Sequence, residues 1–173
     1  MLKPILLAAA LSFGATKALA AGPEIGKPAP AFLGVDSNGK AHKLSDFAGK
    51  TVVLEWSNAD CPYVKKHYGS GNMQTTQTAA TAKGAVWLTI VSSAPGKQGA
   101  VTGAEANALT ATRNAKPTAV LLDPAGTIGK AYEAKTTPHM YVIDAKGILR
   151  YQGAIDDKPS SSPDRLKGAN NIV

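Results

Sequence analysis

The sequence predicts a single α/β domain with a mixed central sheet and helices on both faces. Its 173 residues are enough for one core of ordinary size. Two apolar, β-branched runs at 51–56 and 85–91 are typical of buried strands, and each is followed by a helical pattern. A further strand at 117–122 and a strand pair within 140–155 complete the order of elements. The sequence contains no internal repeat and gives no sign of a second domain.

The first twenty residues predict a secretory signal. Residues 1–3 are a short basic start, 4–15 are mostly apolar, and 18–20 (Ala-Leu-Ala) are a small-x-small cleavage signal. The apolar run is too short to span a bilayer, although an uncleaved membrane anchor is the alternative. We therefore expect a signal peptide at 1–20 and a mature domain at 21–173 with no stable membrane insertion. The protein would be exported, to the periplasm if the source is a Gram-negative bacterium and otherwise by secretion.

The charge pattern gives no sign of a site for polyanions. The formal charge of +7 falls to +5 when the signal is removed with Lys3 and Lys17. The lysines are scattered, Lys65-Lys66 is the only adjacent pair, and no stripe of aromatic and basic residues suggests nucleic acid. We expect the lysines to be solvated. We also expect the pair Asp156-Asp157 and the imidazole of His42 to lie on the surface.

The N-terminal part of the domain predicts a β-hairpin. Residues 21–30 carry several Gly and Pro residues and should form an extended lead-in. The runs 31–35 and 41–44 flank Asn38-Gly39, a strong hairpin turn signal. Residues 45–50 should form a turn or a single helical turn before the first buried strand.

The first long helix is predicted to begin directly after the only cysteine. Proline suits the first helical position, so Pro62 places Cys61 at or beside the N-cap. Gly and Ser residues at 69–72 interrupt the pattern, which resumes as a second helical piece at 73–83.

The remaining elements follow from caps, turns and apolar runs. They are, in order, a helix opened by the capping box Thr102–Glu105 and ending near Asn114, the strand at 117–122, a short helix over 128–134, a hairpin of 140–143 with 148–155, and a polar stretch at 156–163. The sequence stops at 170–173 as if a helix were beginning, so we expect a shortened sequence that lacks its last helix, with a short native tail as the alternative.

Cys61, at or beside the N-cap of the predicted first long helix, is expected to be reactive. With one cysteine, the chain forms no internal disulfide, and a single cysteine in an exported protein indicates intermolecular pairing or a free reactive thiol. A helix N-terminus stabilises a thiolate through its free N–H groups and its positive dipole end. Lys65 and Lys66 would add positive potential, whereas Asp60 would oppose it. The alternative is a buried, inert thiol, since free cysteine is often fully buried.

The segment around Cys61 resembles the thioredoxin superfamily, in which a Cys-x-x-Cys motif opens the first long helix. Here the motif reads Cys61-Pro62-Tyr63-Val64. The stretch Gly26-Lys27-Pro28-Ala29-Pro30-Ala31-Phe32, with the later Gly49-Lys50-Thr51-Val52-Val53-Leu54, resembles the redoxin and alkyl-hydroperoxide-reductase branch. Thr136-Thr137-Pro138 resembles the loop whose proline is cis and packs beside the catalytic cysteine. These landmarks span roughly 26–155, nearly the whole mature domain.

The resemblance implies a thioredoxin-like fold and a peroxiredoxin-like or thiol-disulfide oxidoreductase. Cys61 would be the catalytic nucleophile, and His139 would join the two lysines in tuning the thiolate. The residues implied as the active-site wall are Trp56, Ser57, Asn58, Pro62, Tyr63, Thr137 and Pro138. The thiolate would attack a peroxide oxygen or a disulfide sulfur, and an external thiol or partner protein would then regenerate it.

The departures from the family pattern bear on the mechanism. Val64 replaces the second cysteine, so the protein cannot resolve a mixed disulfide internally. Peroxiredoxins carry Thr or Ser three residues before the cysteine and Pro seven before it, where this chain has Asn58 and Leu54. Ser57 lies one place off. The supporting arginine of that family has two candidates, Arg113 and Arg150, between which the sequence does not choose.

Other readings of these residues remain open at this stage. A non-enzymatic module that binds extended peptides or a partner in the same cleft is the alternative function. Cys61, His67 and His139 lack a recognised metal-ligand spacing, so we expect no metal, and we expect no cofactor. Trp87 is expected to be a core residue.

Overall fold

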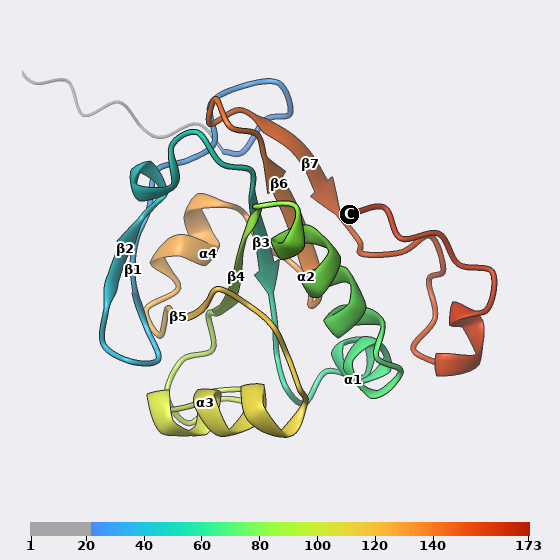
Figure 1. The fold of residues 1–173 in the computed structure, drawn as a ribbon. Helices are drawn as coiled ribbons and strands as arrows, with labels where there is room; N and C mark the ends of the chain where they lie inside the picture. Colours follow the sequence, from blue (N-terminus) through green and yellow to red (C-terminus); the bar gives the residue numbers. More distant parts are fainter. Residues whose placement is uncertain (1–21) are drawn as a thin grey trace, which may run out of the picture.

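The computed structural model describes residues 22–173, so the predicted signal peptide at 1–20 lies outside the described residues. Within this range the chain folds around one mixed sheet with helices on both faces, as the sequence predicts (Figure 1). The seven strands of the described chain are arranged in the order β2-β1-β5-β4-β3-β6-β7. Their bounds are β1 Leu33–Asp36, β2 Ala41–Lys43, β3 Val52–Trp56, β4 Val86–Val91, β5 Ala119–Leu122, β6 His139–Ile143 and β7 Leu149–Gly153.

The middle of the sheet is parallel and its borders are antiparallel. β4 lies between β3 and β5 and runs parallel to both, whereas β6 pairs antiparallel with β3. The hairpin β1-β2 joins β5 antiparallel, and β7 completes the other border. In this register Trp56, the last residue of β3, lies opposite Ile90 and His139. The C-terminal end of β3 therefore meets the start of β6.

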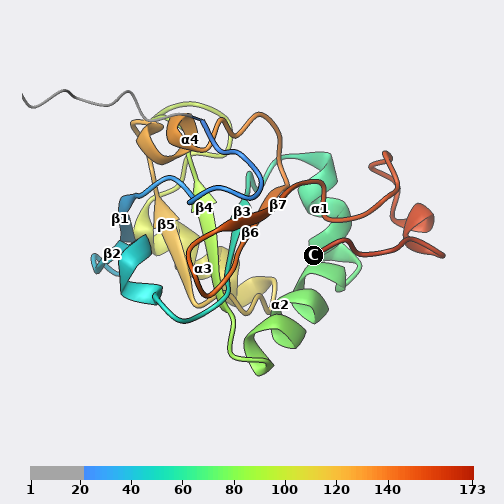
Figure 2. The same cartoon turned by 90° about the horizontal axis from the view of Figure 1, so that it is seen from above.

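The helices divide between the two faces of the sheet (Figures 1 and 2). The helices on one face are α1 Pro62–Gly69, α2 Asn72–Ala82 and α3 Gly103–Thr112, and the helix on the other is α4 Thr127–Ala131. Short 3₁₀ helices cover Leu44–Phe47 and Pro163–Leu166. Thr102 caps α3, accepting a hydrogen bond from the Glu105 amide at 3.3 Å, which confirms the predicted capping box. No helix of the described residues is long and apolar enough to cross a membrane.

Two apolar clusters hold these layers together. The first lies under α4, where Tyr132 packs against Trp56 and Tyr141 of the sheet, with ring centroids 5.4 and 5.3 Å away. The second lies under α1 and α2 and includes Val64, Met73 and Trp87. Burial of Trp87 confirms its prediction as a core residue.

The N-terminal hairpin is confirmed, but the prediction of a solvated His42 is wrong. The turn before β2 contains Gly39, whose φ of +83° favours glycine. His42 is only 8 % exposed because its ring stacks on Phe47 and its Nε2 lies 2.8 Å from Asp36 Oδ2. Although burial raises the pKa of Asp36, the hydrogen bonds from His42 and from backbone amides outweigh it, and the pKa lies below its usual value.

Candidate thiol site

Cys61 occupies the N-cap of α1, as the sequence predicts. Its backbone is extended, with φ −65° and ψ 126°, and Pro62 begins the helix. The carbonyl of Cys61 accepts a hydrogen bond from the Lys65 amide at 2.9 Å, which starts the helical ladder. The thiol is free and partly buried, so it packs against its neighbours and is still accessible to a reactant.

The loop before β6 lies against the cysteine. Cys61 Sγ donates to the Thr137 carbonyl oxygen over 3.0 Å. The Thr137–Pro138 peptide bond is cis, as the family resemblance implies. This contact joins residues 76 positions apart, and it follows from the antiparallel pairing of β3 with β6. The sheet register thus brings the start of β6 to the N-terminus of α1.

Thr136 and Thr137 line two depressions of the surface near Cys61. The larger is an open groove of about 600 Å³, and the smaller has about 230 Å³. Tyr63, 44 % exposed, lines the larger groove. The other residues of the larger groove are His67, Thr136, Thr137, Pro138, Ala154, Ile155, Asp156, Asp157, Lys158 and Pro159. The surface that lines the groove is mostly apolar, so the groove suits an extended chain with an apolar side chain.

The residues just before Cys61 line the smaller depression. Trp56 is 3 % exposed and donates its indole N–H to Ser92 Oγ at 3.0 Å, so most of its ring belongs to the core. Ser57 is buried beside it. The Asn58 carboxamide accepts from the Asp60 amide at 2.9 Å and donates to the Gln98 carbonyl at 3.4 Å. Asn58 is therefore occupied in holding the loop that carries the cysteine.

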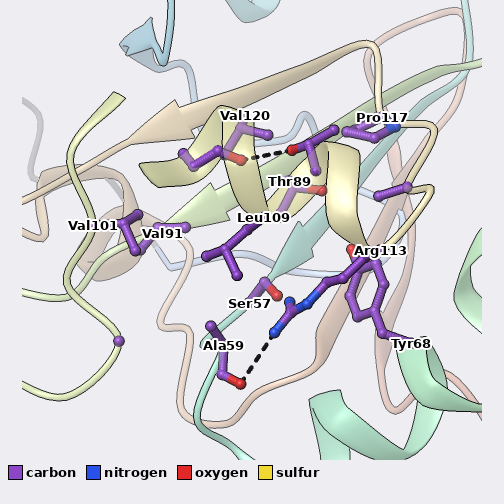
Figure 3. Close-up of a pocket in the computed structure, with 14 residues that line it drawn as sticks. Ser57, Ala59, Tyr68, Thr89, Val91, Val101, Leu109, Arg113, Pro117 and Val120 are labelled. Atoms are coloured by element: carbon purple, nitrogen blue, oxygen red, sulfur yellow. Dashed lines mark hydrogen bonds between the residues drawn. The ribbon is translucent and has the colours of Figure 1, made fainter. Parts of the chain in front are cut away.

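The structure distinguishes the two candidate arginines. Arg113 stacks over the ring of Tyr68 at 4.9 Å and donates to the Ala59 carbonyl at 3.2 Å, two residues before Cys61 (Figure 3). Both contacts lie at a cavity of about 40 Å³ between α3 and the sheet. Arg150 instead pairs with Asp144 at the β6-β7 hairpin. Only Arg113 touches the loop of the cysteine.

The adjacent lysines differ in a way that the sequence does not predict. Lys65 is exposed, but the Lys66 side chain is fully buried and its Nζ lies 2.8 Å from Asp156 Oδ2. The prediction of solvation is therefore wrong for Lys66, and the prediction of a surface location is wrong for Asp156, which is 6 % exposed. Asp157 is exposed, as expected. Lys66 is directed at the segment after β7, where its charge is neutralised by the carboxylate.

The two histidines of this region make different contacts. His67 lines the larger groove and lies 3.7 Å from Asp156 Oδ2, and burial lowers its pKa to about 4. His139 Nδ1 lies 3.0 Å from Tyr141 Oη and 3.4 Å from the Lys135 amide. Burial, followed by the charge of Lys135, lowers the pKa of His139. The contacts of His139 thus join it to its own strand and loop and do not reach Cys61.

The sequence did not lead us to Glu55, a fully buried acid on β3. Glu55 accepts hydrogen bonds from Tyr68 Oη at 2.9 Å, Trp87 Nε1 at 2.9 Å, Thr89 Oγ1 at 3.1 Å and Gln77 Nε2 at 3.2 Å. Burial raises the pKa of Glu55 despite these four donors. The signal was a single acid inside an otherwise apolar run, and such an acid requires partners when it is buried. Glu55 links β3 and β4 to α1 and α2.

Between residues 22 and 173, no group of three or more His, Cys, Asp or Glu side chains is placed to hold a metal ion. The chemistry available at the site is that of one thiol, a backbone carbonyl and an open groove.

Solved structures with the same fold come from several bacteria. An uncharacterised conserved protein from Geobacillus kaustophilus matches with a TM-score of 0.71 and 22 % identity, over 83 % of this chain and 78 % of that one. The thioredoxin domain of a thiol-disulfide oxidoreductase from Bacteroides vulgatus matches with a TM-score of 0.60 and 18 % identity, over 83 % and 96 %. A secreted disulfide oxidoreductase from Mycobacterium tuberculosis matches with a TM-score of 0.56 and 18 % identity, over 79 % and 92 %. These likenesses establish the thioredoxin-like fold.

No curated protein matches the sequence significantly. The model of the redoxin family, in contrast, matches residues 24–170, which is most of the chain and includes the site of Cys61. The chain therefore belongs to the redoxin family.

Proposed function

We propose that this redoxin is an exported thiol oxidoreductase in which Cys61 exchanges disulfides with a polypeptide partner. Membership in the redoxin family supports a thiol oxidoreductase. The observation that carries the finer proposal is the placement of a partly buried, free thiol at the N-cap of α1, against a loop that borders a groove of about 600 Å³. A groove of this size suits a polypeptide, whereas a peroxide needs little space.

The surroundings of Cys61 favour disulfide exchange over peroxide reduction. Leu54, at the position of the peroxiredoxin proline, is fully buried in the core. Asn58, at the position of the peroxiredoxin hydroxyl, uses its carboxamide to hold its own loop. The hydroxyl and proline by which that family is recognised are both replaced, and one replacement is occupied elsewhere.

The proposed reaction has two exchange steps. The Cys61 thiolate attacks one sulfur of a partner disulfide, so that the partner's S–S bond breaks, a Cys61–S–S–partner bond forms, and the second partner sulfur leaves as a thiolate. An external thiol then attacks the mixed disulfide, releasing the Cys61 thiolate and forming a new disulfide with the partner sulfur. Val64 makes the external thiol necessary, since no second cysteine is present in the chain.

The Thr137 carbonyl has a defined role in this scheme. In the resting protein it accepts the S–H of Cys61, which fixes the side-chain rotamer of the thiol. Loss of the proton removes this hydrogen bond and leaves the sulfur facing a carbonyl oxygen. The thiolate is then favoured to move toward the free N–H groups of α1 or toward an incoming disulfide.

Export is the second part of the proposal. The basic, apolar and small-residue pattern of residues 1–20 supports it, and the structural neighbour from M. tuberculosis is a secreted protein. Mass spectrometry of the protein recovered from cell fractions would test it. Cleavage after Ala20 or Ala21 in the exported fraction supports export, and an intact N-terminus in the cytoplasmic fraction contradicts it.

The exchange activity can be measured on the reduced protein with a peptide held in a thionitrobenzoate disulfide, which releases a coloured thiolate. We expect release of the coloured thiolate to be lost in Cys61→Ser. Hydrogen peroxide consumption in excess dithiothreitol is the parallel assay. Peroxide turnover without peptide exchange would reassign the substrate. An unreactive thiol that still binds peptides would indicate a binding module, the alternative function.

A further inference from the structure

The most unusual charged residue near the site is Lys66, whose side chain is 0 % exposed. Its Nζ lies 2.8 Å from Asp156 Oδ2, 2.9 Å from the Ser160 carbonyl and 3.3 Å from the Lys158 carbonyl. An ammonium group has three hydrogen-bond donors, so each donor has an acceptor. All three acceptors lie on one short segment, 90 or more positions away in the sequence.

This segment is held from two sides, by the C-terminal residues at its start and by Lys66 further along. Residues 154–162 form no helix or strand. Residues 155–157 hydrogen-bond to residues 170–172 and the Ile155 side chain is buried, whereas the carbonyl oxygens of Lys158 and Ser160 are held by Lys66. In Figures 1 and 2 the chain after β7 extends past α1 as an irregular loop. Lys66, on the second turn of α1, therefore fixes residues 158–160 of this loop to the helix that Cys61 caps.

The same segment forms one wall of the larger groove. Residues 154–159 face the loop of Thr136, Thr137 and Pro138, with Tyr63 also lining the groove. The carbonyl oxygen of Thr137 accepts the hydrogen bond from the Cys61 thiol. The space beside the nucleophile is thus bounded by a loop whose backbone carbonyls are held by Lys66.

We propose that Lys66 is a positioning residue that holds the 154–159 wall, and that this wall selects polypeptide disulfides with an apolar residue beside the reacting cysteine. The inference rests on the proposed function and names its substrate class. The groove presents Tyr63, Pro138, Ala154 and Pro159, which offer apolar surface to a neighbouring side chain. Lys66 touches no substrate. It acts through the wall.

Removal of both charged partners gives the clearest test. Loss of Lys66 alone would leave Asp156 buried without its partner, which is strongly destabilising. Asp156 also lines the groove, so its replacement must not add apolar surface there. The test variant is therefore the double substitution Lys66→Met with Asp156→Asn, which removes both charges and keeps the shape of the Asp156 side chain. Lys83→Met, a change of an exposed lysine at the end of α2, is the matched control.

Two peptide disulfides distinguish an effect on the position of the wall from an effect on the reactivity of Cys61. One peptide carries Phe beside its cysteine and the other carries Gly, each activated as the thionitrobenzoate disulfide. We expect the wild type and Lys83→Met to prefer the Phe peptide about tenfold, the range for one apolar side chain in a pocket. The double variant should lose this preference through a higher KM, while its rate with iodoacetamide stays within about twofold of the wild type.

The outcomes distinguish this inference from the function on which it rests. A wild type that reacts with neither peptide contradicts the proposed function and the inference together. A wild type that reacts but shows no preference, or a folded double variant that keeps the preference, contradicts the inference alone. If the double variant lost rate equally with iodoacetamide and with both peptides, Lys66 would act on the reactivity of the Cys61 thiolate, and its role at the wall would be overturned.

Discussion

Val64 lies three residues after Cys61, within the same helical turn, and both belong to the apolar cluster under α1. Val64 is fully buried, whereas Cys61 is partly exposed. This is the arrangement of a thiol pair at a helix start with the inner sulfur replaced by an aliphatic group. It restricts the chain to chemistry that an outside thiol must complete.

Restoring the inner thiol should therefore change the oxidation chemistry of the protein. Because residues three apart on a helix are neighbours, Val64→Cys is expected to form an internal disulfide with Cys61 on mild oxidation. Counting free thiols under denaturing conditions would show two in the reduced variant and none in the oxidised monomer. The substitution is nearly volume-conserving, so its cost to stability should be below about 1.5 kcal/mol.

Val64→Ala is the control for this change, since it opens the same space without adding a thiol. The monomer of this variant should retain one titratable thiol before and after mild oxidation. Oxidation of Val64→Cys to a disulfide-linked dimer that keeps its second thiol free would show that the two side chains do not meet.

The two arginines should differ in their effect on stability and on the thiol. Arg113→Ala removes a cation–π contact and a charged hydrogen bond to the Ala59 carbonyl, and we expect a loss of about 2 kcal/mol in the free energy of unfolding. The loop before Cys61 would lose an anchor, so the alkylation rate of the thiol should also change. Urea unfolding and iodoacetamide kinetics measure the two effects.

Arg150→Ala supplies the comparison, because Arg150 is largely exposed and pairs with Asp144 at a surface hairpin. Exposed pairs contribute roughly 0–1 kcal/mol. Equal effects of the two substitutions on the thiol would show that contact with the cysteine loop is unimportant.

The sequence predicted most elements of the fold because their signals are periodic or local. The apolar runs of β3 and β4 mark buried strands, and Pro62 marks the start of α1 next to Cys61. The proximity of Cys61 to Thr137 was not a local signal. It came from resemblance to a family, and the pairing of β3 with β6 is its physical cause.

The polar contacts in the interior could not be predicted in this way. Lys66 and Asp156 are 90 positions apart, and nothing in either neighbourhood specifies the other. Glu55 interrupts an apolar run, but its donors Gln77 and Trp87 lie 22 and 32 positions further along. Such pairs depend on three-dimensional packing, which a periodic pattern does not encode.

His67 should make the protein sensitive to mild acid. Burial lowers the pKa of His67 in the folded chain from 6.5 to about 4, so the unfolded chain takes up the proton first as the pH falls. Stability is therefore expected to decrease from pH 6.5 to about pH 4, by up to about 3 kcal/mol. The contact with Asn72 agrees with a neutral ring: Asn72 Nδ2 donates to His67 Nδ1 at 2.9 Å, which requires that nitrogen to be unprotonated.

The measurement for His67 is urea unfolding at a series of pH values between 7 and 4. His67→Gln, which cannot titrate, should lose less stability than the wild type across this range. The charges facing His67 are Lys66, which disfavours the imidazolium, and Asp156, which favours it. Parallel stability curves for the two proteins would show that His67 is protonated equally in the folded and unfolded chains.

Glu55 should make the stability of the protein decrease as the pH rises, which is opposite to the effect of His67. Substitution of Glu55 should also change the stability far more than substitution of His67. Because the pKa of Glu55 is raised, its contribution to stability is fully present below the unfolded pKa of 4.5 and decreases as the pH rises through the folded pKa.

Glu55→Leu leaves four buried donors without their shared acceptor, and we expect it to cost about 3–5 kcal/mol. Glu55→Gln keeps the shape, can donate to Tyr68 Oη as a protonated acid would, and removes the titration. Urea unfolding at pH 5 and pH 8 should therefore show a smaller loss for Glu55→Gln than for the wild type as the pH rises. A wild type as stable at pH 8 as at pH 5, with Glu55→Leu no less stable, would remove Glu55 as the polar link between the sheet and the helices that carry Cys61.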